Sequence, residues 1–163
     1  AMRMRPVTSN AESITTFDLA MMERAIELGR QGSLKGEIPV GAVVYRGQEI
    51  ISEAHNLRET MHDPSAHAER LAITEAGQKL ETWRLTDCSL AVTLEPCPMC
   101  AGLLVNARLH RLVYGATDPK AGACDTLYNI PSDKRLNHAV EVHGGVMADQ
   151  CADLLRCFFL ERR

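Results

Sequence analysis

The run CSLAVTLEPCPMCAGLLVNARL, which begins at Cys88, most constrains the fold because it changes from a strand pattern to a helix pattern without a linker. Pro98 fits the first turn of that helix, where its missing N–H has no helical partner in any case. Cys97 and Cys100 are three residues apart and fall in the same turn, so both sulfurs face one side of the helix. The short connection therefore fixes two cysteines at a strand-to-helix junction.

A second strand-to-helix junction lies upstream, at DPSAHAE. The run IPVGAVVYRGQEIISEAHN gives two strand-forming segments joined at residues 46–48, which is typical of a β-hairpin, and Asn56 closes the second segment. Asp63-Pro64 then predicts a turn, and a helix pattern follows in AERLAITEAGQKL. His67 is therefore expected at the start of a helix, as Cys97 is.

The remaining patterns complete an alternation of strands and helices. An amphipathic helix begins after Thr15, whose spacing from Asp18 indicates a capping box. HRLVYGAT and AVEVHG predict two further strands, and ADQCADLLRCFFLERR predicts a C-terminal helix. The side chains of that helix expected to face inward are Cys151, Leu154, Leu155, Phe158 and Phe159. The alternation predicts an α/β sandwich in which parallel strand pairs are covered on both faces.

Length and composition fit one domain. The chain has 163 residues, 45% of them hydrophobic, and no low-complexity or Pro/Gly-rich linker divides it, so we expect a flexible N-terminus at 1–14 and a single domain at 15–163. The formal charge of −3 excludes a globally basic nucleic-acid binder but leaves room for a local basic stripe. No apolar run approaches the roughly 18 residues of a membrane span, and the first residues lack the core of a signal peptide. These features predict a soluble, cytoplasmic protein that does not bind membranes.

The cysteines number six, an even count that would suit three disulfides in a small secreted protein. A chain with a full-size core in a reducing compartment has no need of such cross-links. We therefore interpret Cys97 and Cys100 as metal or redox residues. The other four are expected to pack as ordinary buried cysteines: Cys88, Cys124, Cys151 and Cys157.

His67, Cys97 and Cys100 form a candidate metal site. Free N–H groups and the positive end of the helix dipole favour thiolates at a helix start, and zinc binds thiolates and imidazoles. A structural zinc site would need a fourth protein ligand. The candidates for a fourth are His62, Cys88 and Cys124. None of them belongs to a second close pair, so three ligands leave one position for water, whose pKa zinc lowers to about 7.

Glu69 follows His67 by two residues. In the first turn of a helix the side chains of His67 and Glu69 can both reach the same metal-bound water. A carboxylate beside an activated water can take its proton and deliver it to a leaving group. The alternative is an acid that is simply favoured at a helix N-terminus. The combination of HAE and PCxxC, each at a strand-to-helix junction, favours the catalytic interpretation and matches the known signature of zinc nucleobase deaminases.

Six motifs in order carry a closer resemblance: EIPVGAVV, HDPSAHAE, TLEPCPMCAG, VYGATDPKAGA, LNHAVEV and FFLERR. From about Phe17 to Arg163 the chain resembles the cytidine deaminase superfamily, and in particular the bacterial tRNA adenosine deaminases. This implies a three-layer α/β/α, cytidine deaminase-like fold around a five-stranded mixed sheet. It also implies a zinc-dependent deaminase domain with one Zn²⁺ per subunit, held by His67, Cys97 and Cys100, and with Glu69 as the proton shuttle.

The same resemblance implies a homodimer that binds a tRNA anticodon stem-loop and deaminates its wobble adenosine. The substrate-binding residues that it implies are Asn56, Ala68, Asp118, Lys120, Asn137 and Phe159. Asn56 could instead close a β-turn, Asp118 could form an Asx-turn, and Phe159 could pack in the core. Leu160 and Glu161 give the terminal segment less basic character than the family often carries.

Two other functions fit the zinc motifs. A free nucleobase deaminase, acting on guanine or cytosine, would share HAE and PCPMC, and activity on a free base without activity on tRNA would select it. A non-catalytic zinc module or inactive partner subunit is the second alternative. Glu69 is unfavourable to it, because a structural metal site has no use for a proton shuttle.

Overall fold

The computed structural model describes residues 13–162. In chain order the elements are α1 (Thr16–Leu34), β1 (Gly41–Arg46), β2 (Glu49–His55), α2 (Ala68–Leu80), β3 (Ser89–Leu94), α3 (Pro98–Asn106), β4 (Arg111–Ala116), β5 (Glu141–His143) and α4 (Ala148–Glu161). The flexible N-terminus predicted at 1–14 falls mostly on residues 1–12, outside the described range. That boundary stays a prediction.

The strands form one five-stranded mixed sheet in the order β2-β1-β3-β4-β5. β1 is antiparallel to both β2 and β3, whereas β3, β4 and β5 are parallel to one another. A parallel pair needs a crossover, which α3 supplies between β3 and β4. The expected parallel pairs are therefore confined to one half of the sheet.

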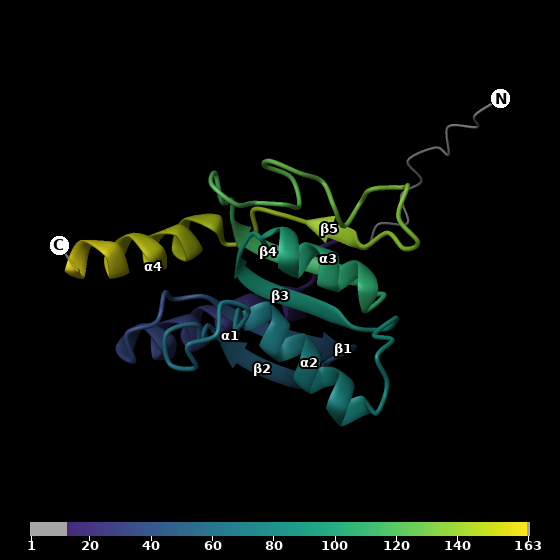
Figure 1. Ribbon diagram of the computed structural model, residues 1–163, viewed down its shortest axis with the longest axis horizontal. Coiled ribbons are helices and arrows are strands. Elements are labelled where there is room, and N and C mark those ends of the chain that lie inside the picture. Colours follow the sequence, from purple (N-terminus) through teal and green to yellow (C-terminus); the bar gives the residue numbers. More distant parts are fainter. Residues whose placement is uncertain (1–12, 163) are drawn as a thin grey trace.

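Helices cover both faces of the sheet, which confirms the three-layer α/β/α prediction (Figure 1). Successive strand side chains alternate between the two faces. Ala42 and Val44 of β1 pack with α2 and α3, whereas Val43 and Tyr45 pack with α1 and α4. α2 and α3, the helices that begin at the two predicted motifs, therefore cover the same face of the sheet. The strands before them bring the starts of both helices to one side of the core.

The first helix starts with the predicted capping box. The Asp18 N–H donates to Thr15 Oγ1 at 3.0 Å, and the Thr15 N–H donates to Asp18 Oδ2 at 2.7 Å. Each side chain satisfies a backbone N–H that the helix leaves unpaired. Met22 and Ala25 are then fully buried on the sheet.

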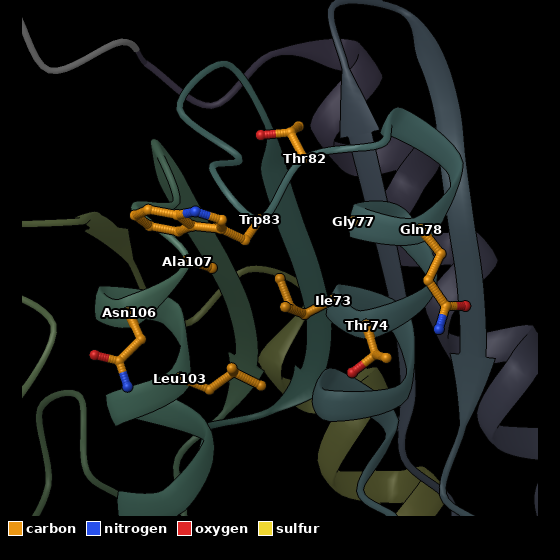
Figure 2. A pocket seen from close by; sticks show the side chains of 9 residues that line it. All are labelled: Ile73, Thr74, Gly77, Gln78, Thr82, Trp83, Leu103, Asn106 and Ala107. Atoms are coloured by element: carbon orange, nitrogen blue, oxygen red, sulfur yellow. The ribbon is translucent and has the colours of Figure 1, made fainter.

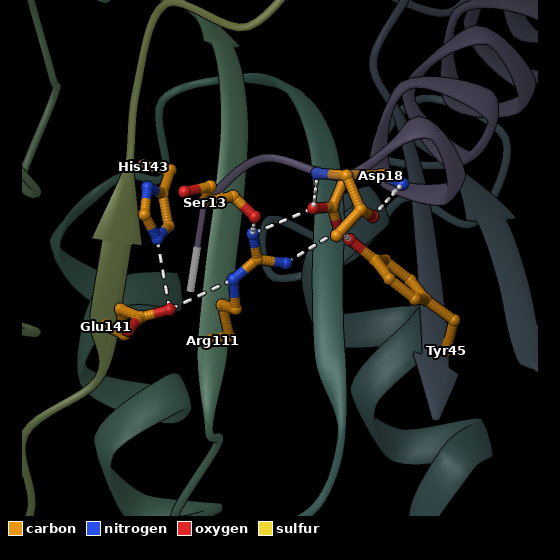
Figure 3. Close-up of polar contacts among 7 residues, drawn as sticks. Ser13, Asp18, Tyr45, Arg111, Glu141 and His143 are labelled. Carbon is orange, nitrogen blue, oxygen red and sulfur yellow. Dashed lines mark hydrogen bonds and ion pairs between the residues drawn. The ribbon is translucent and has the colours of Figure 1, made fainter. Parts of the chain in front are cut away.

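Asp18 also belongs to a buried ion network that connects α1 with three strands (Figure 3). Arg111 of β4 donates to both oxygens of Asp18, at 2.6 and 2.7 Å, and to Glu141 of β5 at 3.0 Å. Tyr45 of β1 donates its hydroxyl to Asp18 at 2.5 Å. The Arg111 guanidinium further donates to the Ser13 carbonyl at 3.2 Å. The network fixes α1 against the sheet at the ends of the strands that lie farthest from the predicted metal site.

Two side chains are more exposed than the sequence predicts. Phe159 is 54% exposed, so its expected inward position is wrong, whereas Phe158 and Cys151 are buried. α4 contacts the sheet at its beginning and then extends beyond it (Figure 1), which leaves the later turns little to pack against. Cys157 on the same stretch, which was expected to be buried, is also exposed.

Among residues 13–162, no helix is long and apolar enough to span a bilayer.

Candidate metal centre and its cavity

His67 and Cys97 occupy equivalent positions at the starts of two helices. His67 is the N-cap of α2 and Cys97 is the N-cap of α3, with Pro98 at the first helical position. Neither side chain caps its own helix, so both are available for another partner. Cys100 lies in the first turn of α3 and is fully buried. Local sequence thus positions each donor, and the adjacent packing of α2 and α3 brings the donors together.

The spacing of the three donors fits a tetrahedral metal. His67 Nδ1 lies 3.6 Å from Cys97 Sγ and 3.6 Å from Cys100 Sγ, and all three atoms lie within 4.8 Å of one another. Zinc bond lengths of roughly 2.3 Å to sulfur and 2.05 Å to nitrogen give a tetrahedral S···N edge of about 3.6 Å. The two N···S separations therefore match the N···S edges of a zinc tetrahedron.

A fourth protein donor is not found in the part of the chain that the structure describes. His62, Cys88 and Cys124 lie outside the only group of three or more metal-binding side chains within residues 13–162. A closed structural site would include four such donors. Three donors beside a cavity instead suit a metal with one open position.

The charges at the site also favour a cation. A hydrogen bond from Cys100 lowers the pKa of Cys97 to about 4, so one sulfur is a thiolate at neutral pH. The same hydrogen bond, together with burial, raises the pKa of Cys100. The hydrogen bond to Cys97 raises the pKa of His67. A divalent cation bound by both sulfurs would displace the remaining thiol proton of Cys100.

A cavity of about 220 Å³ opens beside the three donors. Its lining consists of Ile38, Val40, Asn56, Arg58, His67, Ala68, Glu69, Leu94, Glu95, Cys97, Asp118 and Ala121. Ligand pockets usually measure about 300–1,000 Å³, so this cavity suits a single flat ring system better than a larger ligand. Of the residues predicted to bind substrate, Asn56, Ala68 and Asp118 line it.

Glu69 is a buried carboxyl in this cavity, 4% exposed. It forms no ion pair with a lysine or arginine among residues 13–162. Burial therefore dominates and raises the pKa of Glu69 to about 7. A carboxyl with such a pKa exchanges a proton readily near neutral pH.

Asn56 is held by the backbone on both sides of the cavity mouth. Its Nδ2 donates to the Ile38 carbonyl at 3.4 Å, and its Oδ1 accepts from the Arg58 N–H at 3.1 Å. The turn-closing role and the cavity-lining position therefore occur together. Its orientation is fixed before any ligand enters.

Asp118 forms the Asx-turn that was the alternative to substrate binding, yet it also lines the cavity. Its Oδ1 accepts from the N–H groups of Lys120 at 2.9 Å and Ala121 at 3.2 Å. Lys120 and Asn137 are exposed on the long segment between β4 and β5, and neither lines the cavity. The predicted substrate residues thus divide into a group at the cavity and a group on the outer surface.

Arg58 and Glu95 line the cavity but were not predicted from the sequence. Arg58 follows Asn56 by two residues, and nothing in its local sequence distinguishes it from a loop arginine. Glu95 did carry a signal, because an acid at the end of an apolar strand is rarely buried without partners. Its hydrogen bonds come from residues far along the chain, where no local pattern marks them.

Comparisons with known proteins place this geometry among deaminases. A family model described as MafB19-like deaminase matches residues 17–163. A tRNA-specific adenosine deaminase from Bacillus subtilis (strain 168) is 49% identical over 148 residues, covering 91% of this chain and 92% of that protein. The tRNA-specific adenosine deaminase of Haemophilus influenzae is 44% identical over 148 residues, covering 90% of this chain and 86% of that protein.

Solved structures show the same fold. One from a study of A-to-I editing by tRNA:A34 deaminases at the wobble position of transfer RNA matches with a TM-score of 0.80 and 37% identity, covering 83% of this chain and 99% of that chain. A guanine deaminase from Nitrosomonas europaea matches with a TM-score of 0.77 and 25% identity, covering 86% of this chain and 83% of that chain. Tertiary structure alone therefore does not separate nucleic-acid substrates from free bases.

Proposed function

This chain belongs to the tRNA-specific adenosine deaminases. We propose that it deaminates the wobble adenosine of a tRNA-Arg(ACG) anticodon hydrolytically, which gives inosine and releases ammonia. The observation that carries the proposal is the position of Glu69 in the same cavity as His67 and Cys97. A metal-binding group, a buried acid with a pKa near neutrality and room for one base are the parts that hydrolytic deamination of a base requires.

We assign one Zn²⁺ per chain to His67, Cys97 and Cys100. Bound there, it would act as a Lewis acid and lower the pKa of a water molecule beside the target base. Glu69 moves two protons in turn: it takes the first from the attacking water and delivers it to the ring nitrogen, and it takes the second from the hydroxyl added to the ring carbon and delivers it to the amino group, which leaves as ammonia. Water is consumed and ammonia released, so no further reactant is needed.

We assign recognition of the target base to Asn56, with the backbone of Ala68 forming part of the cavity wall. Asn56 has a fixed orientation and a hydrogen-bonding side chain at the mouth. The cavity of about 220 Å³ admits a base only when it leaves its stack, which bases of a single-stranded loop do at low cost. An anticodon loop therefore suits this site better than a duplex.

We assign the outer contacts with the anticodon stem-loop to Lys120, Asn137 and Phe159, and the contact with the bound base at the cavity wall to Asp118. Lys120 and Asn137 lie on the exposed segment that leads from the cavity wall, which supports a path for RNA along it. Phe159 is exposed and packs edge-on against Phe158, with ring centroids 5.3 Å apart. An exposed aromatic ring of this kind can stack on a base.

We also propose a homodimer in the cytoplasm. An apolar groove of about 430 Å³ lies on the outer side of α2 and α3 (Figure 2), and its lining includes Ile73, Trp83 and Leu103. The groove is lined by the later turns of these helices and by the residues that follow them, and a second copy seated there would bury this apolar surface. All six cysteines are free, which supports a reducing compartment. Trp83→Glu is expected to shift the dimer toward monomer in light scattering at matched concentrations.

The decisive experiment incubates the protein with unmodified tRNA-Arg bearing an ACG anticodon and sequences it for inosine at the wobble position. We expect inosine with the wild-type protein and none with Glu69→Ala. The similarity to a guanine deaminase makes deamination of a free base the second candidate. Ammonia release from free guanine or cytosine, without inosine in tRNA, would select that function instead.

A further inference from the structure

Glu95 is a buried acid that belongs neither to the metal donors nor to the proton path. It follows β3 directly, is 2% exposed and borders the cavity beside Leu94 and Cys97. A carboxylate in this environment is retained only when hydrogen bonds compensate its burial. The donors that satisfy Glu95 therefore reveal what it does.

Among the described residues 13–162, all the hydrogen bonds that the Glu95 carboxylate accepts come from one loop, residues 118–126. Its Oε2 accepts from three successive backbone N–H groups: Cys124 at 3.1 Å, Asp125 at 2.9 Å and Thr126 at 3.0 Å. Its Oε1 accepts from the Asp118 N–H at 3.2 Å and from the Thr126 hydroxyl at 2.5 Å. The carboxylate thus binds both ends of the loop, much as a nest of N–H groups binds an anion.

The backbone of the loop packs closely around the Glu95 carboxylate, and this is possible because residue 122 is a glycine without a Cβ. A Cβ at Gly122 would lie 2.4 Å from Glu95 Oε1 and 2.6 Å from the Asp118 carbonyl oxygen. The Ala123 N–H also donates to the Pro96 carbonyl at 2.9 Å, beside the acid. The residue next to the metal-binding cysteine and the loop therefore form one tightly packed unit.

The opposite side of the same loop faces the cavity. Asp118 and Ala121 form part of its lining. Asp118 is the residue whose N–H is held by Glu95 Oε1. Loss of that hydrogen bond would let this wall move, while His67 and Glu69, which belong to α2, would keep their positions.

We propose that Glu95 is a positioning residue for base recognition: its carboxylate fixes loop 118–126 so that Asp118 and Ala121 form a rigid wall of the cavity. This inference rests on the proposed function, because the wall is assigned to the target base. Glu95 does not touch the reacting atoms. Its effect is therefore expected on substrate binding more than on the chemical step.

Glu95→Gln is the test variant because it preserves the shape of the side chain. Both oxygens of Glu95 accept from loop N–H groups, so whichever way the glutamine amide is turned, its NH₂ group faces at least one of these N–H groups. That N–H then has no acceptor. With the anticodon stem-loop as substrate, we expect KM to rise about tenfold or more and kcat to change less. Zinc content is expected to equal that of the wild type. Thr126→Val removes only the hydroxyl donor and is expected to raise KM in the same direction by a smaller factor.

Asp18→Asn is the matched control, since it also alters a buried carboxylate but borders no part of the cavity. It is expected to lower the melting temperature and leave KM unchanged. Unchanged KM in both Glu95→Gln and Thr126→Val would overturn the proposal. So would a loss confined to kcat with reduced zinc content, which would make Glu95 a support for Cys97. If Glu95→Gln does not fold, Thr126→Val alone decides between these results.

Hydrogen exchange separates this proposal from the proposed function. Failure of the wild-type protein to edit the stem-loop would refute the function, whereas loop rigidity is measured without substrate. In Glu95→Gln we expect faster exchange at residues 118–126. Residues 59–60 serve as the internal control, because the buried Glu37 carboxylate holds their N–H groups at 3.0 and 2.7 Å and is unchanged in this variant. Equal exchange of 118–126 in variant and wild type would overturn the role of Glu95.

Discussion

Asp18 and Glu69 are buried acids on opposite faces of the same sheet, 1% and 4% exposed. Burial disfavours the charged form of both. Asp18 receives hydrogen bonds from Arg111, Tyr45 and the Thr15 N–H, which outweigh burial and hold the pKa of Asp18 well below its usual range. Glu69 forms no ion pair with a lysine or arginine among residues 13–162, and burial outweighs the nearby His67 and raises the pKa of Glu69 to about 7.

The difference shows that the partners of a buried acid, rather than burial itself, decide what the acid does. Asp18 is held permanently charged, and its hydrogen bonds are used to connect α1 to β4. Glu69 is left able to gain and lose a proton beside a metal-binding group. Strongly raised pKa values in a cavity are typical of acids that take part in chemistry. Substitutions at the two sites should therefore separate activity from stability.

The largest effect is expected from Glu69→Ala. Deamination should fall by a factor of about 10²–10⁴ or more, because the proton shuttle is lost. Zinc content and the free energy of unfolding should stay close to wild type, since Glu69 is not one of the three donors and forms no ion pair with a lysine or arginine among residues 13–162. Inosine formation, metal analysis and urea unfolding measure the three quantities. Turnover near the wild-type rate would remove Glu69 from the mechanism.

The second effect concerns stability. Asp18→Ala should lower the free energy of unfolding by about 3 kcal/mol, because it removes the charge that pairs with buried Arg111. This destabilisation is small for the loss of one partner of a buried ion pair, since Glu141 still accepts from Arg111 at 3.0 Å. Urea unfolding measures it, and kcat at temperatures below the transition should be unchanged. A large loss of kcat in the folded variant would contradict the separation of the two sites.

A smaller loss is expected from Tyr45→Phe. It removes one hydroxyl donor to a charged carboxylate and should cost about 1.5 kcal/mol of stability. The ring still packs against Phe17, with centroids 5.6 Å apart, so the apolar contact is kept. A double-mutant cycle with Asp18→Asn gives the coupling energy. A coupling near zero would show that the Tyr45 hydroxyl does not stabilise the Asp18 charge.

The smallest effect is the pH dependence that Asp18 adds. Because the pKa of Asp18 is lower in the folded state than the unfolded value of about 3.9, its contribution is fully present above that value and is lost as pH falls toward the folded pKa. Between pH 7 and pH 4 the loss should be only about 0.3 kcal/mol, and it should steepen below pH 4. The stability difference between wild type and Asp18→Asn should therefore shrink with acid. A difference that grows below pH 4 would reverse the assigned direction.

Sequence patterns predicted the local features of this protein because neighbouring residues decide them. The capping box at Thr15, the hairpin after Arg46 and the helix starts at His67 and Cys97 each depend on a few consecutive residues. The motif resemblance also predicted the three layers and the mixed sheet. The sequence therefore determined which donors stand at the starts of two helices.

Only the tertiary structure decided which distant groups meet. Arg111 reaches Asp18 across 93 residues, and Glu95 reaches Thr126 across 31, because strand order and loop path bring them together. Phe159 shows the same limit, since its helical position predicted burial but α4 extends beyond the sheet that would cover it. Local propensity acts within a turn or a strand pair, whereas these contacts depend on the relative placement of elements that no short stretch of sequence specifies.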